Sequence, residues 1–187
     1  MLDLKRGSVA LFGHDPEWDV EGERTVADLR SVFGNRAIDI HHVGSTSIPT
    51  IPAKPIIDIA LAAGDFDDVA PLVNSLEAKG YYLRPSQNTP DHLLLAKGSL
   101  YNGSGDLQTH FIHVVLKDSR QWFDYLNFRE YLLEHPNTAR EYAALKPALA
   151  NTVSTDKAEL PITSANRTLL HTPSPPLEPS ITDKLSS

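Results

Sequence analysis

The apolar run "PIIDIALAA", residues 55–63, constrains the fold most, because it contains a single charged residue, Asp58. Its length and its β-branched residues predict a strand that is buried on both faces. Side chains alternate along a strand, so Asp58 shares one face with Ala60, while Ile57 and Ile59 point to the other. A carboxylate in an apolar strand is costly unless it is paired or binds a cation. Asp58 is therefore either one member of an ion pair or a candidate ligand.

A loop rich in small polar residues, "HVGSTS" at 42–47, precedes this strand, and twelve residues separate Ser45 from Asp58. Glycine lets the backbone approach a ligand closely, and exposed backbone N–H groups attract phosphate oxygens. Gly44, Ser45 and Thr46 are therefore predicted to form a phosphate-binding loop. A plain turn after a strand is the alternative, because this motif is short and common.

Two more side chains flank the loop. Lys54 lies four residues before Asp58, and in an extended segment its side chain points to the same face. It is a candidate partner for Asp58 or for a ligand phosphate, and a solvated surface lysine is the alternative. His42 stands on the approach to the loop. Its neighbour His41 points to the opposite face, so the two do not form a joint metal site.

The segment "THFIHVV", residues 109–115, predicts a later strand with two histidines. Alternation places His113 and Phe111 on one face and His110 on the other, so both histidines cannot enter one site without a bulge. Of the two, we rank His113 first as a site residue and His110 second as a metal ligand. Imidazole suits zinc, nickel, copper or iron better than magnesium, and it also serves as a general acid or base near neutral pH. A core imidazole bonded to a backbone group is the alternative for either ring.

The rest of the chain predicts an α+β fold with a mixed β-sheet and helices mainly on one face. Capping residues and glycine stops predict a helix at 16–33 after Asp15, and another helix between Asp65 and Gly80. The other expected elements are a strand that ends at Gly44, strands at 81–84, 92–97 and 108–116, a hairpin turn at 102–106, a helix capped by Asp118, and a last helix that ends near Lys146 and Pro147.

Length and composition narrow the class of protein. The 187 residues suffice for one domain, placed at 1–170, and the Pro- and Ser-rich segment 171–187 is expected to be a flexible tail. The formal net charge of −7 argues against an extended nucleic-acid surface, and the lack of cysteine excludes disulfides and thiolate sites. No apolar run approaches the ~18 residues of a membrane span. We expect a cytoplasmic protein without a membrane segment, and composition does not indicate its oligomeric state.

The motif "HVGSTSIP" followed by "AKPIIDI" resembles the glycine-serine loop and acidic strand of the nucleotidyltransferase fold superfamily, and more narrowly the GrpB-like family. The resemblance extends through "HDPEW" at 14–18, "THFIHVV" and "FREYLLEHPNTAREYAALK" at 128–146, and covers roughly residues 14–150. It implies a nucleotidyltransferase-like sheet, a loop that grips nucleotide phosphates and acids that hold magnesium. In the GrpB-like pattern His42 belongs to the loop motif and Arg129 recurs, which makes Arg129 a candidate anion contact.

One departure from the superfamily limits the implied chemistry. The superfamily has a second acid two residues after the first, where this chain has Ala60, and the GrpB-like family generally lacks that acid too. Two-metal phosphoryl transfer needs carboxylates that hold cations beside the attacking and leaving oxygens. One aspartate cannot hold both cations alone.

Three hypotheses on function follow. The first is a transferase that moves a nucleotidyl or phosphoryl group, with Mg²⁺ or Mn²⁺ at Asp58 and with His113 as a ligand or base. The second is a binding module without turnover for a nucleotide or a coenzyme A-like ligand, since relatives of the GrpB-like domain occur fused to dephospho-coenzyme A kinase. In both, the partner is a small phosphorylated ligand. The third is an enzyme of different chemistry, in which Asp58 and His113 bind a transition metal or act as an acid–base pair.

Overall fold

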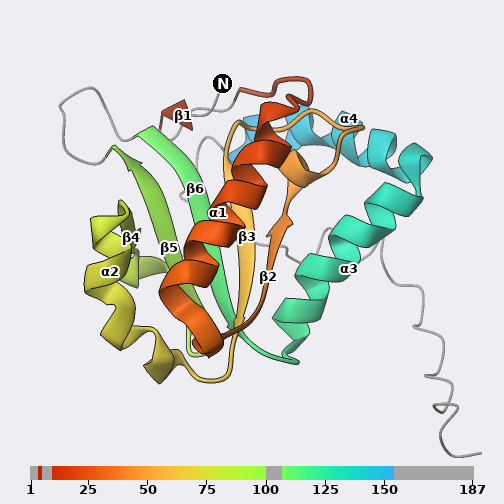
Figure 1. Ribbon diagram of the computed structural model, residues 1–187. Coiled ribbons are helices and arrows are strands. Elements are labelled where there is room, and N and C mark those ends of the chain that lie inside the picture. Colours follow the sequence, from red (N-terminus) through yellow and green to blue (C-terminus); the bar gives the residue numbers. More distant parts are fainter. Residues whose placement is uncertain (1–3, 6–9, 100–106, 154–187) are drawn as a thin grey trace, which may run out of the picture. The chain divides into compact units, whose positions relative to one another are not determined.

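The computed structural model describes residues 4–5, 10–99 and 107–153, which lie within one compact unit, Met1–Thr155 (Figure 1). The predicted turn at 102–106 and the predicted tail at 171–187 fall outside the described residues. The strands are β1 (Leu4–Lys5), β2 (Ala37–Val43), β3 (Ile57–Ala63), β4 (Tyr81–Leu83), β5 (His92–Ser99) and β6 (Leu107–Leu116), and the α-helices are α1 (Glu17–Phe33), α2 (Val73–Ala78), α3 (Arg120–Glu134) and α4 (Pro136–Val153).

The sheet has the strand order β2-β3-β6-β5-β4, with the short β1 paired to β6. Its centre is a parallel pair, β3 and β6, in which Ala60 lies opposite His113. β2 and β5 pair antiparallel with the outer edges of these two strands. Every residue of β3 except Asp58 is buried, in agreement with the predicted strand that is covered on both faces. The predicted α+β class with a mixed sheet is confirmed.

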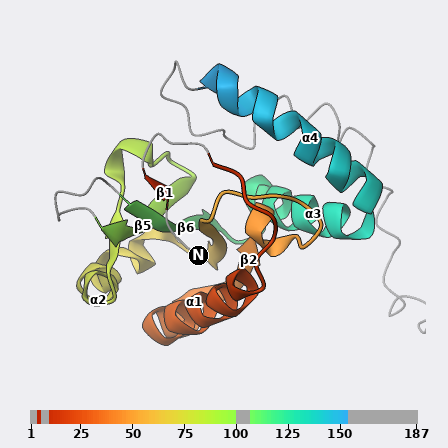
Figure 2. The same cartoon turned by 90° about the horizontal axis from the view of Figure 1, so that it is seen from above.

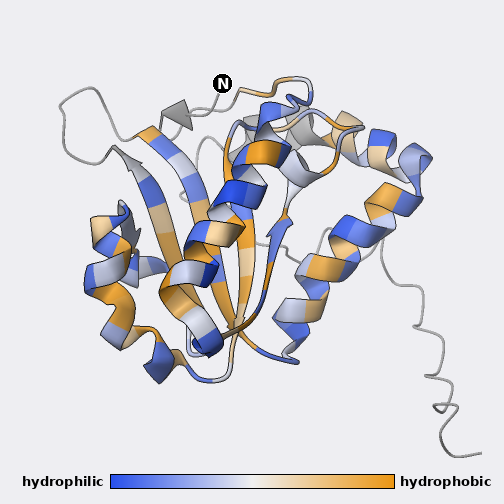
Figure 3. Ribbon diagram, in the orientation of Figure 1, coloured by the Kyte–Doolittle hydropathy of each residue, from blue (hydrophilic) through white to orange (hydrophobic). Residues whose placement is uncertain are grey.

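Helices cover both faces of the sheet, as the view from above in Figure 2 shows. On one face, α1 and α2 enclose the larger core cluster, to which Trp18, Phe33 and Leu76 belong. On the other face, Trp122 of α3 packs in a smaller cluster with Val43 of β2. The sequence predicts helices mainly on one face, whereas the structure adds α3 on the second face, because the central strands carry apolar residues on both sides. Figure 3 shows these apolar residues along the sheet between the helices.

The boundaries of α1 follow the predicted capping residues. The Asp15 carboxylate accepts a hydrogen bond from the backbone N–H of Glu17 at 3.0 Å. At the other end, Gly34 has a φ of 54° and its N–H donates to the carbonyl oxygen of Arg30. Because this positive φ favours glycine, the helix ends where the sequence predicts.

The predicted cap of α3 is wrong by one residue. Ser119 caps the helix, and its hydroxyl accepts a hydrogen bond from the N–H of Trp122 at 3.2 Å. Asp118 instead takes a φ of 60° in the turn that precedes the cap. Both residue types cap helices well, so the choice between neighbours depends on the backbone path out of β6.

Two other helices differ in length from their predictions. The helix predicted from Asp65 begins as two 3-10 turns, and α2 itself covers only Val73–Ala78. Pro71 in the second turn has no N–H to donate, which disfavours a regular α-helix there. The last helix, α4, continues through Pro147 to its end at Val153. An interior proline removes one helical hydrogen bond, and α4 nevertheless continues past it.

Candidate functional site

The predicted phosphate loop and Asp58 are in direct contact. Gly44 begins the loop with a φ of 70° and a ψ of −170°, a conformation that favours glycine. A Cβ atom on Gly44 would lie 2.6 Å from Oδ2 of Asp58. Val43 lies opposite Asp58 in the β2–β3 pair, and this register brings the loop to the carboxylate. The glycine therefore meets two requirements, a positive φ and space for the carboxylate.

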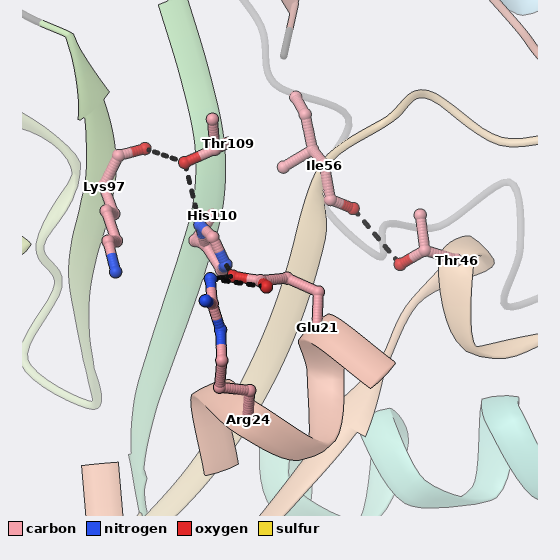
Figure 4. Close-up of polar contacts among 7 residues, drawn as sticks. All are labelled: Glu21, Arg24, Thr46, Ile56, Lys97, Thr109 and His110. Carbon is pink, nitrogen blue, oxygen red and sulfur yellow. Dashed lines mark hydrogen bonds and ion pairs between the residues drawn. The ribbon is translucent and has the colours of Figure 1, made fainter. Parts of the chain in front are cut away.

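His42 is held beside the loop by α1 and by Thr46. The Thr46 hydroxyl donates to the carbonyl oxygen of Ile56 at 3.2 Å (Figure 4), and Nε2 of His42 lies 3.0 Å from the same hydroxyl oxygen. Because the hydroxyl proton is already used, the N–H of His42 is the donor to Thr46. A Cβ on Gly22 would lie 2.3 Å from Nδ1 of His42, so the imidazole packs closely on α1. Burial lowers the pKa of His42 to about 4, which keeps the ring neutral at neutral pH.

We expect Thr46→Val to lower the free energy of unfolding by about 1–3 kcal/mol, because valine keeps the shape and leaves the His42 donor and the Ile56 carbonyl unpaired. Thr46 is 1% exposed, so water cannot replace its hydroxyl. Urea unfolding measures the change, and Thr46→Ser, which keeps the hydroxyl, is the control. Equal stability of the valine variant and the wild type would contradict these hydrogen bonds.

Asp58 and His113 face each other across the central strand pair. Oδ1 of Asp58 lies 3.6 Å from Nε2 of His113, and the two side chains are 30% and 18% exposed. The His113 ring also packs against Tyr125 of α3, with ring centroids 4.9 Å apart. The structure thus places His113 beside Asp58, on the face of β6 expected from strand alternation, and leaves both side chains partly accessible.

His92 extends this pair to β5. Its Nε2 lies 3.1 Å from Nδ1 of His113, and the ring planes are inclined by 28°. Burial, with a further contribution from His113, lowers the pKa of His92 to about 4. The sequence does not indicate His92, because its contact with His113 depends on the register between strands, in which Leu94 lies opposite His113. Alternation alone places His92 and Leu94 on one face of β5, but it does not say which face.

Metal-ligating side chains are few around Asp58. Directly beside it on this face of the sheet lie Ala60, Val43 of β2 and Phe111 of β6, none of which ligates a metal, and His41, opposite Ala60, is bonded to Asp39. Of the residues that the structure describes, Asp58 and His113 are the side chains that could hold a cation here, and they offer one carboxylate and one imidazole. Within the described part of the chain, no group of three or more His, Cys, Asp or Glu side chains could hold a metal ion.

Tyr142 brings α4 to the loop. Its hydroxyl hydrogen-bonds with Ser45, and its ring meets Phe128 of α3 edge-on, with centroids 5.2 Å apart. Burial raises the pKa of Tyr142, and the nearby Asp58 carboxylate acts in the same direction. The sequence does not indicate Tyr142, because its contact with Ser45 depends on how α4 is placed against the loop.

Arg129 reaches the site region from α3. It lines a groove of about 360 Å³ between α1, β2 and α3, together with His42 and Arg30. Nη1 of Arg129 donates to Glu130 at 2.8 Å, while its buried Nε has no hydrogen-bond partner among the described residues. The guanidinium group therefore retains one donor near His42 for which the described residues offer no partner.

Two predicted ligand residues lie away from this arrangement. Lys54 is exposed, and the structure, which describes both residues, shows no ion pair between Lys54 and Asp58. His110 points to the opposite face of β6, where its Nε2 lies 3.1 Å from Oε1 of Glu21 (Figure 4). Glu21 also pairs with Arg24, and burial lowers the pKa of His110. His110 is therefore a core imidazole between the sheet and α1, because no bulge turns it toward Asp58.

Comparison with known proteins gives consistent matches. The family model described as GrpB protein matches residues 8–160. The UPF0157 protein YqkA of Bacillus subtilis is 38% identical over 146 residues, which are 76% of this chain and 40% of that protein. The Glutamate-rich protein GrpB of Alkalihalophilus pseudofirmus is 32% identical over 162 residues, 84% of this chain and 90% of that protein. The crystal structure of GrpB from Enterococcus faecalis aligns with a TM-score of 0.68 and 28% identity, covering 79% of this chain and 86% of that one.

These matches differ in how much of each relative they cover. The chain spans 40% of YqkA and 57% of the UPF0157 protein PA4798 of Pseudomonas aeruginosa. The remaining parts of those two proteins lie outside the aligned region. In the described residues, no helix has the length and apolar character to cross a membrane. Because the matched family model covers most of the sequence, the chain belongs to the GrpB family.

Proposed function

We propose that the chain binds a nucleotide or another small phosphorylated ligand at the loop 44–46, together with one divalent cation between Asp58 and His113. The contact between Gly44 and the Asp58 carboxylate carries this proposal. It places a loop rich in glycine and hydroxyl side chains against the Asp58 carboxylate, which is partly exposed and forms no ion pair with Lys54. A cation bound at this place would offset the charge of phosphate oxygens at the loop.

The proposed roles follow from the contacts of each side chain. Ser45 and the backbone of the loop bind phosphate oxygens, and Tyr142 orients the Ser45 hydroxyl from α4. Asp58 and His113 hold the cation through Oδ1 and Nε2, which face each other at 3.6 Å. Arg129 supplies a positive charge at the edge of the site, where its buried Nε is without a described partner.

Ligand binding is supported more strongly than two-metal transfer. Ala60 and Phe111 occupy the positions on β3 and β6 next to Asp58, and neither can hold a second cation. Nucleotidyl transfer on this chain would therefore depend on a single cation, with His113 as a ligand or general base. Measured turnover separates a transferase from a binding module for a nucleotide or a coenzyme A-like ligand.

Acid–base catalysis is a second candidate function, and the 3.6 Å separation of Asp58 and His113 favours it. A carboxylate beside Nε2 orients the imidazole and stabilises its protonated form during proton transfer. This candidate requires activity that depends on His113 and persists when divalent cations are chelated.

Calorimetric titration tests the proposed function. The panel contains ATP, the other nucleoside triphosphates, coenzyme A and inorganic phosphate, each with and without Mg²⁺ or Mn²⁺, and product analysis follows each binding test. We expect cation-dependent binding that Asp58→Asn weakens by about tenfold or more, because the cation loses its carboxylate ligand. Glu77→Gln on the exposed side of α2 is the matched control. The proposal fails if no phosphorylated compound binds, or if Asp58→Asn binds like the wild type.

A further inference from the structure

His92 contacts the ring nitrogen of His113 that faces away from Asp58. A neutral imidazole carries one proton, so one ring nitrogen donates and the other accepts. Nε2 of His113 faces Oδ1 of Asp58, and Nδ1 faces Nε2 of His92. Asp58 can only accept while it is ionised, whereas His92 can donate or accept. The proton positions on the two rings are therefore linked through the 3.1 Å contact.

Without a ligand, Asp58 and His92 favour the same arrangement, and His92 at 3.1 Å is closer to the His113 ring than Asp58 at 3.6 Å. An ionised Asp58 favours the N–H of His113 on Nε2, which leaves Nδ1 as the acceptor for the N–H of His92. A cation on Nε2 of His113 requires the lone pair there, so the proton of His113 moves to Nδ1 and His92 becomes the acceptor. Both arrangements keep the hydrogen bond between the rings, and only its direction changes.

The rings are held in place for this exchange. His92 lies on β5 two residues from Leu94, which is opposite His113, so the two imidazoles are diagonal neighbours on one sheet face. The His113 ring has a second aromatic neighbour, Tyr125 of α3, and the centroids of these two rings are 4.9 Å apart. The backbone of His92 is itself fixed, since its N–H and carbonyl group exchange hydrogen bonds with Thr89.

We propose that His92 is the positioning residue of this site, which sets the tautomer of His113 by donating to its Nδ1 without a ligand and accepting from it when a cation is bound. The second half of this inference rests on the cation site proposed above. The first half concerns the free protein alone, and the two halves can be tested separately.

Nitrogen-15 NMR of the histidine side chains is the direct test. In the wild type without metal we expect His113 as a single tautomer with its proton on Nε2. In His92→Ala the donor to Nδ1 is gone, and we expect a mixture of tautomers. His92→Gln can still offer an N–H and should restore the single form. His41→Ala, which removes a histidine bonded to Asp39 on β2, is the control and should leave His113 unchanged.

Addition of Zn²⁺, a diamagnetic ion that suits imidazole, tests the second half. We expect the proton of His113 to move to Nδ1 in the wild type, and the Zn²⁺ affinity of His92→Ala to fall about tenfold, as for other partners of metal-bound histidines. An unchanged single tautomer in folded His92→Ala protein without metal would overturn the role of His92. Absence of Zn²⁺ binding by the wild type would instead refute the cation site, and the metal-free spectra would still decide on His92.

Discussion

Gly44→Ala is expected to destabilise the protein by about 2–4 kcal/mol and to abolish ligand binding at the loop. A non-glycine residue in this backbone conformation costs about 1–3 kcal/mol by itself. The new Cβ would also lie 2.6 Å from Oδ2 and 3.0 Å from Cβ of Asp58, so either the loop or the carboxylate must move. Urea unfolding measures the loss of stability, and calorimetry with the ligand panel measures the loss of binding.

Gly34→Ala is the matched control for this experiment. Gly34 also has a positive φ, of 54°, but a Cβ there would meet nothing within 4 Å. We therefore expect the Gly34 variant to show the backbone cost without any effect on binding. If both variants lose the same stability and both keep ligand affinity, the contact between the loop and Asp58 does not define the site.

Acidification is expected to cause the second large effect, a loss of stability below about pH 6.5. Burial lowers the pKa values of His42 and His92 to about 4 and lowers that of His110 as well, whereas an unfolded histidine titrates near 6.5. The unfolded chain then binds the proton more tightly, so stability is fully present above about pH 6.5 and declines as the pH falls toward 4. His42 and His92 each contribute about 1 kcal/mol of this loss between about pH 6.5 and 5.5, and His110 adds to it in the same direction.

His110→Gln isolates one part of this pH dependence. Glutamine keeps an N–H donor near Glu21 and does not titrate, so the stability of the variant should fall less steeply with decreasing pH than that of the wild type. Urea unfolding at a series of pH values measures it. A variant whose stability falls with pH as steeply as the wild type's would show that His110 does not carry its share.

Much of the fold is encoded in local patterns. The apolar run with Asp58 predicts the central strand, because a nearly continuous series of β-branched residues is stable only when both faces are covered. Asp15 and Gly34 mark the ends of α1 through capping and a positive φ, which are properties of single residues. Alternation also separates His113 from His110, since successive strand residues point to opposite faces whatever the sheet around them.

The less accurate predictions concern choices between neighbouring residues of similar propensity. Asp118 and Ser119 are both good capping residues, and the backbone path out of β6 selects Ser119. Pro147 indicates a helix end on local grounds, yet α4 continues to Val153. These outcomes depend on how a segment meets the rest of the molecule, which outweighs local preferences of about 1–3 kcal/mol.

The sequence by itself determined the central strand, the glycine loop and the face on which Asp58 lies, because strand period and glycine conformation are local properties. Tertiary structure decided which side chains meet that carboxylate. The register of β5 against β6 brings His92 to His113, and the return of α4 brings Tyr142 to Ser45. Contacts between segments distant in sequence depend on strand register and helix packing, which no single stretch of the chain specifies.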